Sequence, residues 1–190
     1  MRASVLLFVA LLTVPMTAHA CRAAVQSAEL RHQIPPGLLI AIAEVESGGY
    51  PWVLNTAGEA RRYASREAAL ADAGALLARG ILPLDVGCMQ ISLGYHRGAF
   101  PNLEAAFDPD GNADYAARFL MSLFLENGDG DWGRAVAQYH SRTAWRGDQY
   151  RRRVAAAFGQ QPRPRVAVRQ APPRPAEPRQ VTMRVVRVGQ

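Results

Sequence analysis

The run from Leu38 to Val45 is apolar at seven of its eight positions, and it constrains the fold more than any other part of the chain. Pro35-Pro36 precedes the run and Gly48-Gly49 follows it, which is the punctuation of one helix over residues 38–47. A helix that is apolar on nearly all sides has to be surrounded by other elements. We therefore expect a central buried helix packed inside a shell of amphipathic helices.

Helical periodicity extends through most of the remaining body. The segment after Asp108-Pro109 carries apolar residues at the spacing of a core-facing stripe, and Ser65 and Asp131 precede two further segments as N-caps. No segment of the body alternates apolar and polar residues convincingly, as a strand would. We expect a mainly α fold with little or no β structure, with helices over residues 22–33, 38–47, 65–80, 131–140 and 150–158 and a long one from 108 onward.

The charge of the chain lies outside this helical body. The formal net charge is +6, and residues 162–190 alone carry seven Arg against one acidic residue, Glu177. The same segment holds six of the 13 prolines, which break helices and favour extended chain. We therefore expect one folded domain over residues 21–161 and a disordered basic tail over 162–190. Because the body is nearly neutral, the high pI does not indicate nucleic-acid binding.

Residues 1–20 have the pattern of a secretory signal peptide. Arg2 precedes a short apolar run from Val5 to Leu12, and Ala18-His19-Ala20 matches the small-residue pattern of a cleavage site. The run is too short to span a bilayer, and no later segment is apolar for long enough to do so. We expect export across the inner membrane, cleavage after Ala20, and a periplasmic mature chain without a transmembrane helix.

Cleavage there would make Cys21 the first mature residue, which allows two interpretations. Cys21 and Cys88 are the only cysteines, and such a pair in an exported protein usually forms a disulfide. The alternative is a lipid anchor on Cys21, as in bacterial lipoproteins. Ala18 and His19 fit a lipoprotein signal poorly, because those positions usually hold Leu and a small residue. The sequence favours the disulfide.

Only two carboxylates, Glu44 and Glu46, interrupt the apolar helix. Two residues apart, they point about 200° apart around the helix axis. Glu46 lies in the last turn, where apolar surroundings and the negative end of the helix dipole both raise the pKa of a carboxyl group. A carboxyl group that stays protonated near neutral pH can act as a general acid. The alternative role for Glu46 is to cap the helix or to pair with an arginine.

Four blocks of sequence resemble the soluble lytic transglycosylases, a family with the lysozyme-like fold that cleaves the glycan strands of peptidoglycan. The blocks are Glu46-Ser47-Gly48 with Tyr50-Pro51 and Asn55, then Gly87-Cys88-Met89-Gln90-Ile91, then Asp108-Pro109 with Asn112, and last Ala137-Gln138-Tyr139-His140-Ser141. They follow one another in the family order, and the resemblance covers most of residues 23–158. It implies a lysozyme-like domain that acts on peptidoglycan.

The resemblance also implies roles for individual residues. Glu46 is then the sole catalytic acid and base, Gln90 is an amide that contacts the glycan, and Tyr139 matches the family tyrosine beside the catalytic carboxyl group. The residues that we expect to bind substrate are Ser47, Trp52, Asn55, Gln90, Ser92, Tyr95, Tyr139 and His140. For Trp52 and Tyr95 the competing role is core packing, and for His140 it is a structural histidine.

Four features depart from the family pattern. Asn55 stands where the family has Ser, Cys88 where it has Leu, and His140 where it has Asn. Residues 56–86 form an insertion, which we expect to contain a helix, where the family usually has a few residues. The insertion affects the expected wall of the cleft rather than its catalytic centre.

The family reaction implied by the resemblance needs no second carboxylate and no cofactor. Glu46 would protonate the glycosidic oxygen after N-acetylmuramic acid (MurNAc) and then, as a base, close a 1,6-anhydro ring on that sugar. Lysozyme-type hydrolysis uses a paired carboxylate, and the nearest candidates here, Asp85 and Glu44, belong to no recognisable motif. The rival functions are a hydrolytic muramidase and a non-catalytic glycan-binding module.

Two further expectations concern ligands and partners. The acidic stretches 108–112 and 127–131 lack the glycine and the closing glutamate of a calcium loop, and the histidines show no ligand spacing, so no metal site is predicted. By resemblance to small exported members of the family, the partners would be peptidoglycan glycan strands and an envelope-spanning secretion or flagellar assembly.

Overall fold

The computed structural model describes residues 16–126 and 130–161. The predicted tail over 162–190 and the first 15 residues of the predicted signal peptide lie outside them. The helices are α1 (Met16–Arg31), α2 (Leu38–Ser47), α3 (Arg66–Ala78), α4 (Leu103–Ala106), α5 (Pro109–Glu126), α6 (Trp132–His140) and α7 (Ala144–Gly159). The strands are β1 (Val53–Thr56), β2 (Glu59–Arg62), β3 (Leu84–Val86) and β4 (Ile91–Ser92).

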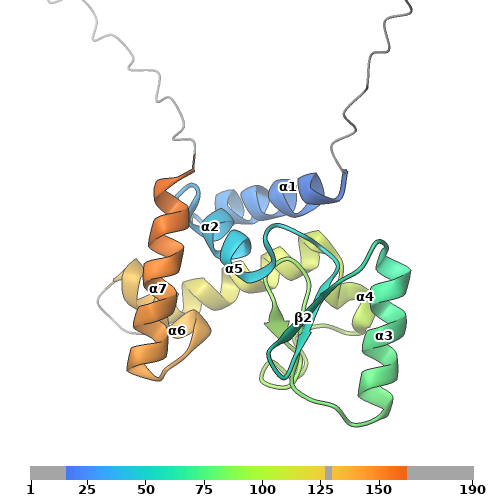
Figure 1. Cartoon of the computed structure of the whole chain (residues 1–190). Coiled ribbons are helices and arrows are strands. Elements are labelled where there is room, and N and C mark those ends of the chain that lie inside the picture. Colours follow the sequence, from blue (N-terminus) through green and yellow to red (C-terminus); the bar gives the residue numbers. More distant parts are fainter. Residues whose placement is uncertain (1–15, 127–129, 162–190) are drawn as a thin grey trace, which may run out of the picture.

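The elements form two lobes, as Figure 1 shows. In the larger lobe α2 packs against α1 and α7, while α5 contacts both α1 and α6. The smaller lobe consists of the sheet with α3 and α4. Each lobe has its own core: Leu39, Ile42 and Leu120 belong to the larger one, and Leu54, Leu84 and Phe107 to the smaller one. The mainly α fold predicted from the sequence is confirmed.

The buried helix predicted over 38–47 is confirmed residue for residue as α2. Ser65 caps α3 by accepting from Ala68 N, and Asp131 caps α6, also as predicted. The predicted start of the last helix is wrong, because α7 begins six residues earlier, at Ala144. Gly147 lies in that first part of α7, where an added Cβ would lie 2.9 Å from the carbonyl oxygens of Ala137 and Ser141. Gly147 permits this close approach, but as a glycine it interrupts the sequence pattern from which the start of α7 could have been predicted.

The little β structure that the prediction allows is a four-stranded antiparallel sheet, whose strands the sequence analysis did not locate. The strand order is β2-β1-β3-β4, with Leu54 opposite Val86 and Asp85 opposite Ser92. The strands are two to four residues long, and β2 is exposed along its whole length. Alternation cannot be recognised over such short segments. The insertion at 56–86 therefore supplies a hairpin strand and a sheet strand as well as the expected helix.

The buried carboxylate of Glu29, on α1, caps the N-terminus of α2. Glu29 accepts hydrogen bonds from the backbone N–H groups of Leu39 (2.7 Å), Ile40 (3.1 Å) and Gly37 (3.0 Å). The N-cap residue, Gly37, has no side chain that could do this. The carboxylate thus satisfies the free donors at the helix start and places its charge at the positive end of the dipole. Glu29 thereby anchors the helix that carries Glu46.

We expect Glu29→Gln to destabilise the domain by about 1–3 kcal/mol, because the amide carries no charge and has one acceptor oxygen instead of two. Thermal unfolding measures this, and Glu104→Gln, at an exposed acid on α4, is the control. Equal melting temperatures for the two variants would show that the cap is dispensable.

Candidate active site

A cleft of about 620 Å³ separates the two lobes. One wall comes from β1, β3 and β4, and the other from α5, α6 and the start of α7, with the end of α2 between them. Most of the residues that the sequence predicts for the site line this cleft: Glu46, Asn55, Gln90, Ser92, Tyr95, Tyr139 and His140.

Glu46 lies in the last turn of α2, and its carboxyl group reaches the cleft. Glu44 is exposed and does not line the cleft, as their spacing on the helix predicts. Burial raises the pKa of Glu46 to about 7, and the negative charge of Asp85 adds to the rise, while Tyr150 and Arg153 oppose it. Near neutral pH the group is therefore divided between an acid that can donate a proton and a base that can accept one.

Tyr150, on α7, is a site residue that the sequence reading missed. Its hydroxyl donates a 2.6 Å hydrogen bond to Glu46 Oε1, and its ring is buried and stacks on His140 with the centroids 4.6 Å apart. Tyr139 lines the cleft, but its hydroxyl donates to the Met89 carbonyl at 3.0 Å. The spacing of Gly147, Tyr150 and Val154, the buried residues of α7, is the sequence signal that could have indicated an inward-facing Tyr150.

Tyr150→Phe tests how this hydrogen bond sets the pKa of Glu46. The bond stabilises the carboxylate, so its loss raises the pKa of Glu46 and keeps the acid protonated at higher pH. We expect the basic limb of the pH–rate profile to move to higher pH, with a loss at the optimum of about tenfold or less. Tyr139→Phe, which removes a hydroxyl bound to a backbone carbonyl, is the control. A limb that moves to lower pH in Tyr150→Phe would contradict this assignment.

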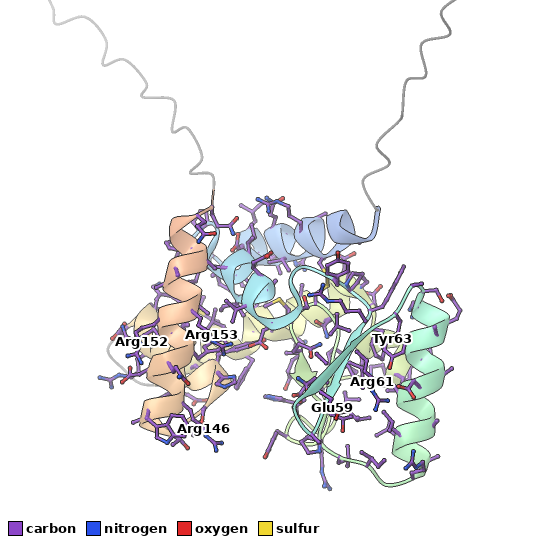
Figure 2. All side chains as sticks on the ribbon, in the orientation of Figure 1. Glu59, Arg61, Tyr63, Arg146, Arg152 and Arg153 are labelled. Carbon is purple, nitrogen blue, oxygen red and sulfur yellow. A yellow bond between two sulfur atoms is a disulfide. The ribbon has the colours of Figure 1, made fainter. Side chains whose placement is uncertain are left out.

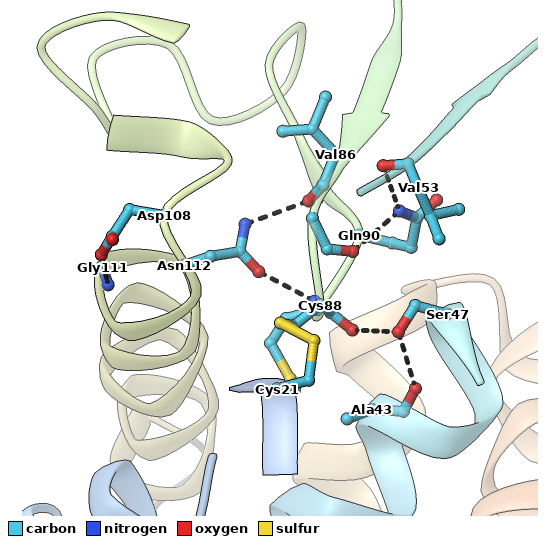
Figure 3. The surroundings of a disulfide bond; sticks show 12 residues. Cys21, Ala43, Ser47, Val53, Val86, Cys88, Gln90, Asp108, Gly111 and Asn112 are labelled. Atoms are coloured by element: carbon cyan, nitrogen blue, oxygen red, sulfur yellow. Dashed lines mark hydrogen bonds between the residues drawn. A yellow bond between two sulfur atoms is a disulfide. The ribbon is translucent and has the colours of Figure 1, made fainter. Parts of the chain in front are cut away.

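The turn at residues 87–90 is held against α2 and α5, as Figure 3 shows. The Ser47 hydroxyl lies 2.8 Å from the Cys88 carbonyl oxygen, and the amide of buried Asn112 accepts from Met89 N at 2.8 Å. Gly87 has φ 81°, and a Cβ there would lie 2.5 Å from the Asn112 amide nitrogen. These contacts set the position of Gln90, which itself has a left-handed φ of 48°.

The disulfide between Cys21 and Cys88 is confirmed, with a Cα–Cα distance of 5.7 Å. It joins α1 to the same turn, directly beside the Ser47 and Asn112 contacts (Figure 3). Both cysteines are fully buried. The larger core is thereby linked covalently to the segment that carries Gln90 into the cleft.

Two of the residues expected to bind substrate are placed elsewhere. Ser47 is 3% exposed and does not line the cleft, so its hydroxyl positions the turn rather than meeting a sugar. Trp52 packs against the core of the smaller lobe and is also absent from the cleft lining. Gln90 does line the cleft, although its Nε2 donates to the Val53 and Gly87 carbonyls. Tyr95 lines the cleft with 83% of its surface exposed.

The cleft lining contains a second carboxyl group, Asp85, on strand β3. Asp85 pairs in register with Asn55 on β1 and Ser92 on β4, and all three line the cleft. Burial raises the pKa of Asp85, while the Ser92 hydroxyl opposes this effect. The sheet therefore brings a carboxyl group, an amide and a hydroxyl to the wall that faces the helices.

Within residues 16–126 and 130–161, no three His, Cys, Asp or Glu side chains gather as they would around a metal ion. None of the helices in this part of the chain is long and apolar enough to cross a membrane.

In the comparison with protein families, residues 23–157 match the Transglycosylase SLT domain. No curated protein and no solved structure matches the chain. The matched region includes α2 with Glu46, the turn that carries Gln90, and both Tyr139 and Tyr150. It spans well over half of the sequence and both walls of the cleft, and it accounts for the lysozyme-like arrangement of the helices. The chain therefore belongs to the transglycosylase SLT domain family, whose substrate is peptidoglycan.

Proposed function

We propose that the protein is a lytic transglycosylase that cleaves the bond between MurNAc and N-acetylglucosamine and leaves a 1,6-anhydro-MurNAc end. The observation that carries the proposal is Glu46, which lines the cleft and whose pKa burial raises to about 7. One group can then perform both proton transfers at neutral pH.

In the first step the Glu46 acid gives its proton to the glycosidic oxygen, and the bond from that oxygen to C1 of MurNAc breaks. The transition state carries positive charge on the sugar ring. In the second step the Glu46 carboxylate takes the proton of the 6-hydroxyl of the same MurNAc, and that oxygen bonds to C1. Glu46 returns to its acid form, and no water is consumed.

The second carboxyl group, Asp85, supports a second candidate function, a hydrolytic muramidase. Lysozyme-type enzymes use a carboxylate across the cleft from the acid, as a nucleophile or as an electrostatic stabiliser. In the transglycosylase reaction an ionised Asp85 would act only as a stabiliser of the positive sugar ring. The two functions therefore use the same two residues, Glu46 and Asp85, but give different products.

Asp85→Asn separates these roles. We expect the rate to fall on the order of 100-fold, because one electrostatic contribution to the transition state is lost. The negative charge of Asp85 raises the pKa of Glu46, so the basic limb of the pH–rate profile should move to lower pH in this variant. Residual product should remain free of new reducing ends. Complete loss of activity together with reducing ends in the wild-type digest would favour the muramidase.

An assay for reducing sugar during digestion of purified sacculi tests the proposal. A transglycosylase makes peptidoglycan soluble without producing new reducing ends, whereas a hydrolase produces one at each cut. Soluble fragments with no increase in reducing sugar are the expected result. One reducing end for each cut would contradict the proposal, and sacculus binding without solubilisation would favour the binding module.

We further propose that the protein acts in the periplasm, in local remodelling of the wall for an envelope-spanning secretion or flagellar assembly. The Cys21–Cys88 disulfide supports export, because such bonds persist in oxidising compartments. It also occupies the sulfur atom on which a lipid anchor would be built. Peptide mapping of the protein isolated from its native host would test this: a mature chain that starts at Cys21 with no free thiol is expected.

A further inference from the structure

Two arginines line one end of the cleft. Arg142 lies in the loop after α6 and Arg146 in the first turn of α7, and both side chains are exposed. Figure 2 shows Arg146 at the end of α7 that lies away from α1. The cavity that these two residues line is the one that contains Glu46.

Arg146 has no carboxylate partner among the described residues. Its contact is with the ring of Trp145, 5.2 Å from the guanidinium carbon to the ring centroid, and Trp145 is itself 63% exposed. Arg142 lies 3.7 Å from Glu126, but both side chains are more than half exposed, so this ion pair is weak. Other surface arginines have closer partners, such as Arg61 with Asp72 at 3.0 Å and Arg151 with Asp148 at 3.2 Å.

The electrostatics of His140, which also lines the cleft, agree with a positive charge on Arg146 at this site. The charges of Arg153 and Arg146 add to burial in lowering the pKa of His140, so that histidine stays neutral at pH 7. Arg153 lies over the Tyr150 ring and partly offsets the cost of ionising Glu46. Arg142 and Arg146 are the arginines of the cleft lining, and their exposed side chains can reach a ligand.

The ligand chemistry follows from the composition of peptidoglycan. The sugar rings carry no charge, and the anionic groups are the free carboxylates of the peptide stems on MurNAc. Cleavage next to MurNAc places a stem beside Glu46. A guanidinium is suited to a carboxylate because it can donate two parallel hydrogen bonds. We propose that Arg146, assisted by Arg142, binds a stem carboxylate and makes the enzyme selective for peptide-bearing glycan; this rests on the proposed function.

Binding of soluble glycan fragments with and without peptide stems tests the inference. Titration calorimetry in the Glu46→Gln background keeps the fragments intact, and the readout is the ratio of the two Kd values. We expect Arg146→Gln to reduce the preference for stem-bearing fragments about tenfold, the effect of one charge-assisted hydrogen bond. Arg146→Lys should restore the preference for stem-bearing fragments only in part, because an ammonium group lacks the planar pair of donors of a guanidinium.

Arg152→Gln is the matched control. Arg152 is an exposed arginine of α7 that is absent from the cleft lining, and Figure 2 shows it on the side of the helix away from Arg153. This control should keep the wild-type Kd ratio. A ratio unchanged by Arg146→Gln, or changed equally by Arg152→Gln, would overturn the inference. The test remains valid if the cleavage products contradict a transglycosylase, because the ratio does not depend on catalysis.

Discussion

Glu46→Gln is expected to lower the rate of sacculus solubilisation on the order of 1000-fold while leaving the fold intact. The amide is nearly the same size as the carboxyl group and can still accept the hydrogen bond from Tyr150, but it cannot donate the proton that the glycosidic oxygen needs. Release of soluble fragments from purified sacculi, followed over time, measures the loss.

Glu44→Gln is the matched control, since Glu44 lies on the exposed side of the same helix and should leave the rate unchanged. Substantial residual activity in Glu46→Gln, or an equal loss in Glu44→Gln, would assign the acid role to another group.

Glu46→Gln should also be more stable than the wild type at alkaline pH. Glu46 has a pKa of about 7 in the folded chain against 4.5 for an ordinary glutamate, so the folded state holds its proton more tightly. The stability of the wild type therefore falls as pH rises from 4.5 to 7, by up to about 3 kcal/mol in total. Thermal unfolding of the wild type and of Glu46→Gln at pH 5 and pH 8 should show a difference in melting temperature only at the higher pH.

The second large effect is expected from the double variant Cys21→Ala, Cys88→Ala. The disulfide spans 67 residues, and its loss should lower the free energy of unfolding by about 4 kcal/mol in the chain-entropy model. The melting temperature should fall by about 10 °C. Ser47, Asn112 and Tyr139 still hold the turn at 87–90, so the folded double variant should continue to cleave peptidoglycan at low temperature.

Reduction of the wild type with dithiothreitol should reproduce the melting temperature of the double variant. An unchanged melting temperature would mean that the bridge contributes nothing to stability, and a folded but inactive double variant would mean that the bridge alone holds Gln90 in place.

The residues that could be predicted from sequence are those whose signals are local. The apolar run at 38–45, bracketed by Pro35-Pro36 and Gly48-Gly49, indicates α2 and its burial, and the spacing of Glu44 and Glu46 indicates that these carboxylates point to different sides of the helix. The two cysteines, in a sequence that begins with the pattern of a signal peptide, indicate their own pairing. The apolar run and the glutamate spacing are patterns within a few residues, and each of the two cysteines has only the other as a possible partner.

The features that sequence reasoning missed depend on contacts between distant segments. The strands are too short to alternate, and they form because Leu54, Leu84 and Val86 share a core with α3. Tyr150 reaches Glu46 across 104 positions, so no spacing rule connects them. Trp52 flanks a motif block, yet the fold turns it into the smaller lobe. Asp85 joins Glu46 in the cleft lining only when the sheet forms.

Mass analysis of the muramyl ends produced in heavy-oxygen water tests the central claim most directly. A transglycosylase closes O6 of MurNAc onto C1, so each new end is lighter by one water than a reducing end and carries no heavy oxygen. A muramidase adds solvent oxygen at C1, so each new end carries the label. We predict unlabelled 1,6-anhydro ends from the wild type and none from Glu46→Gln. Labelled reducing ends as the main wild-type product would contradict the account.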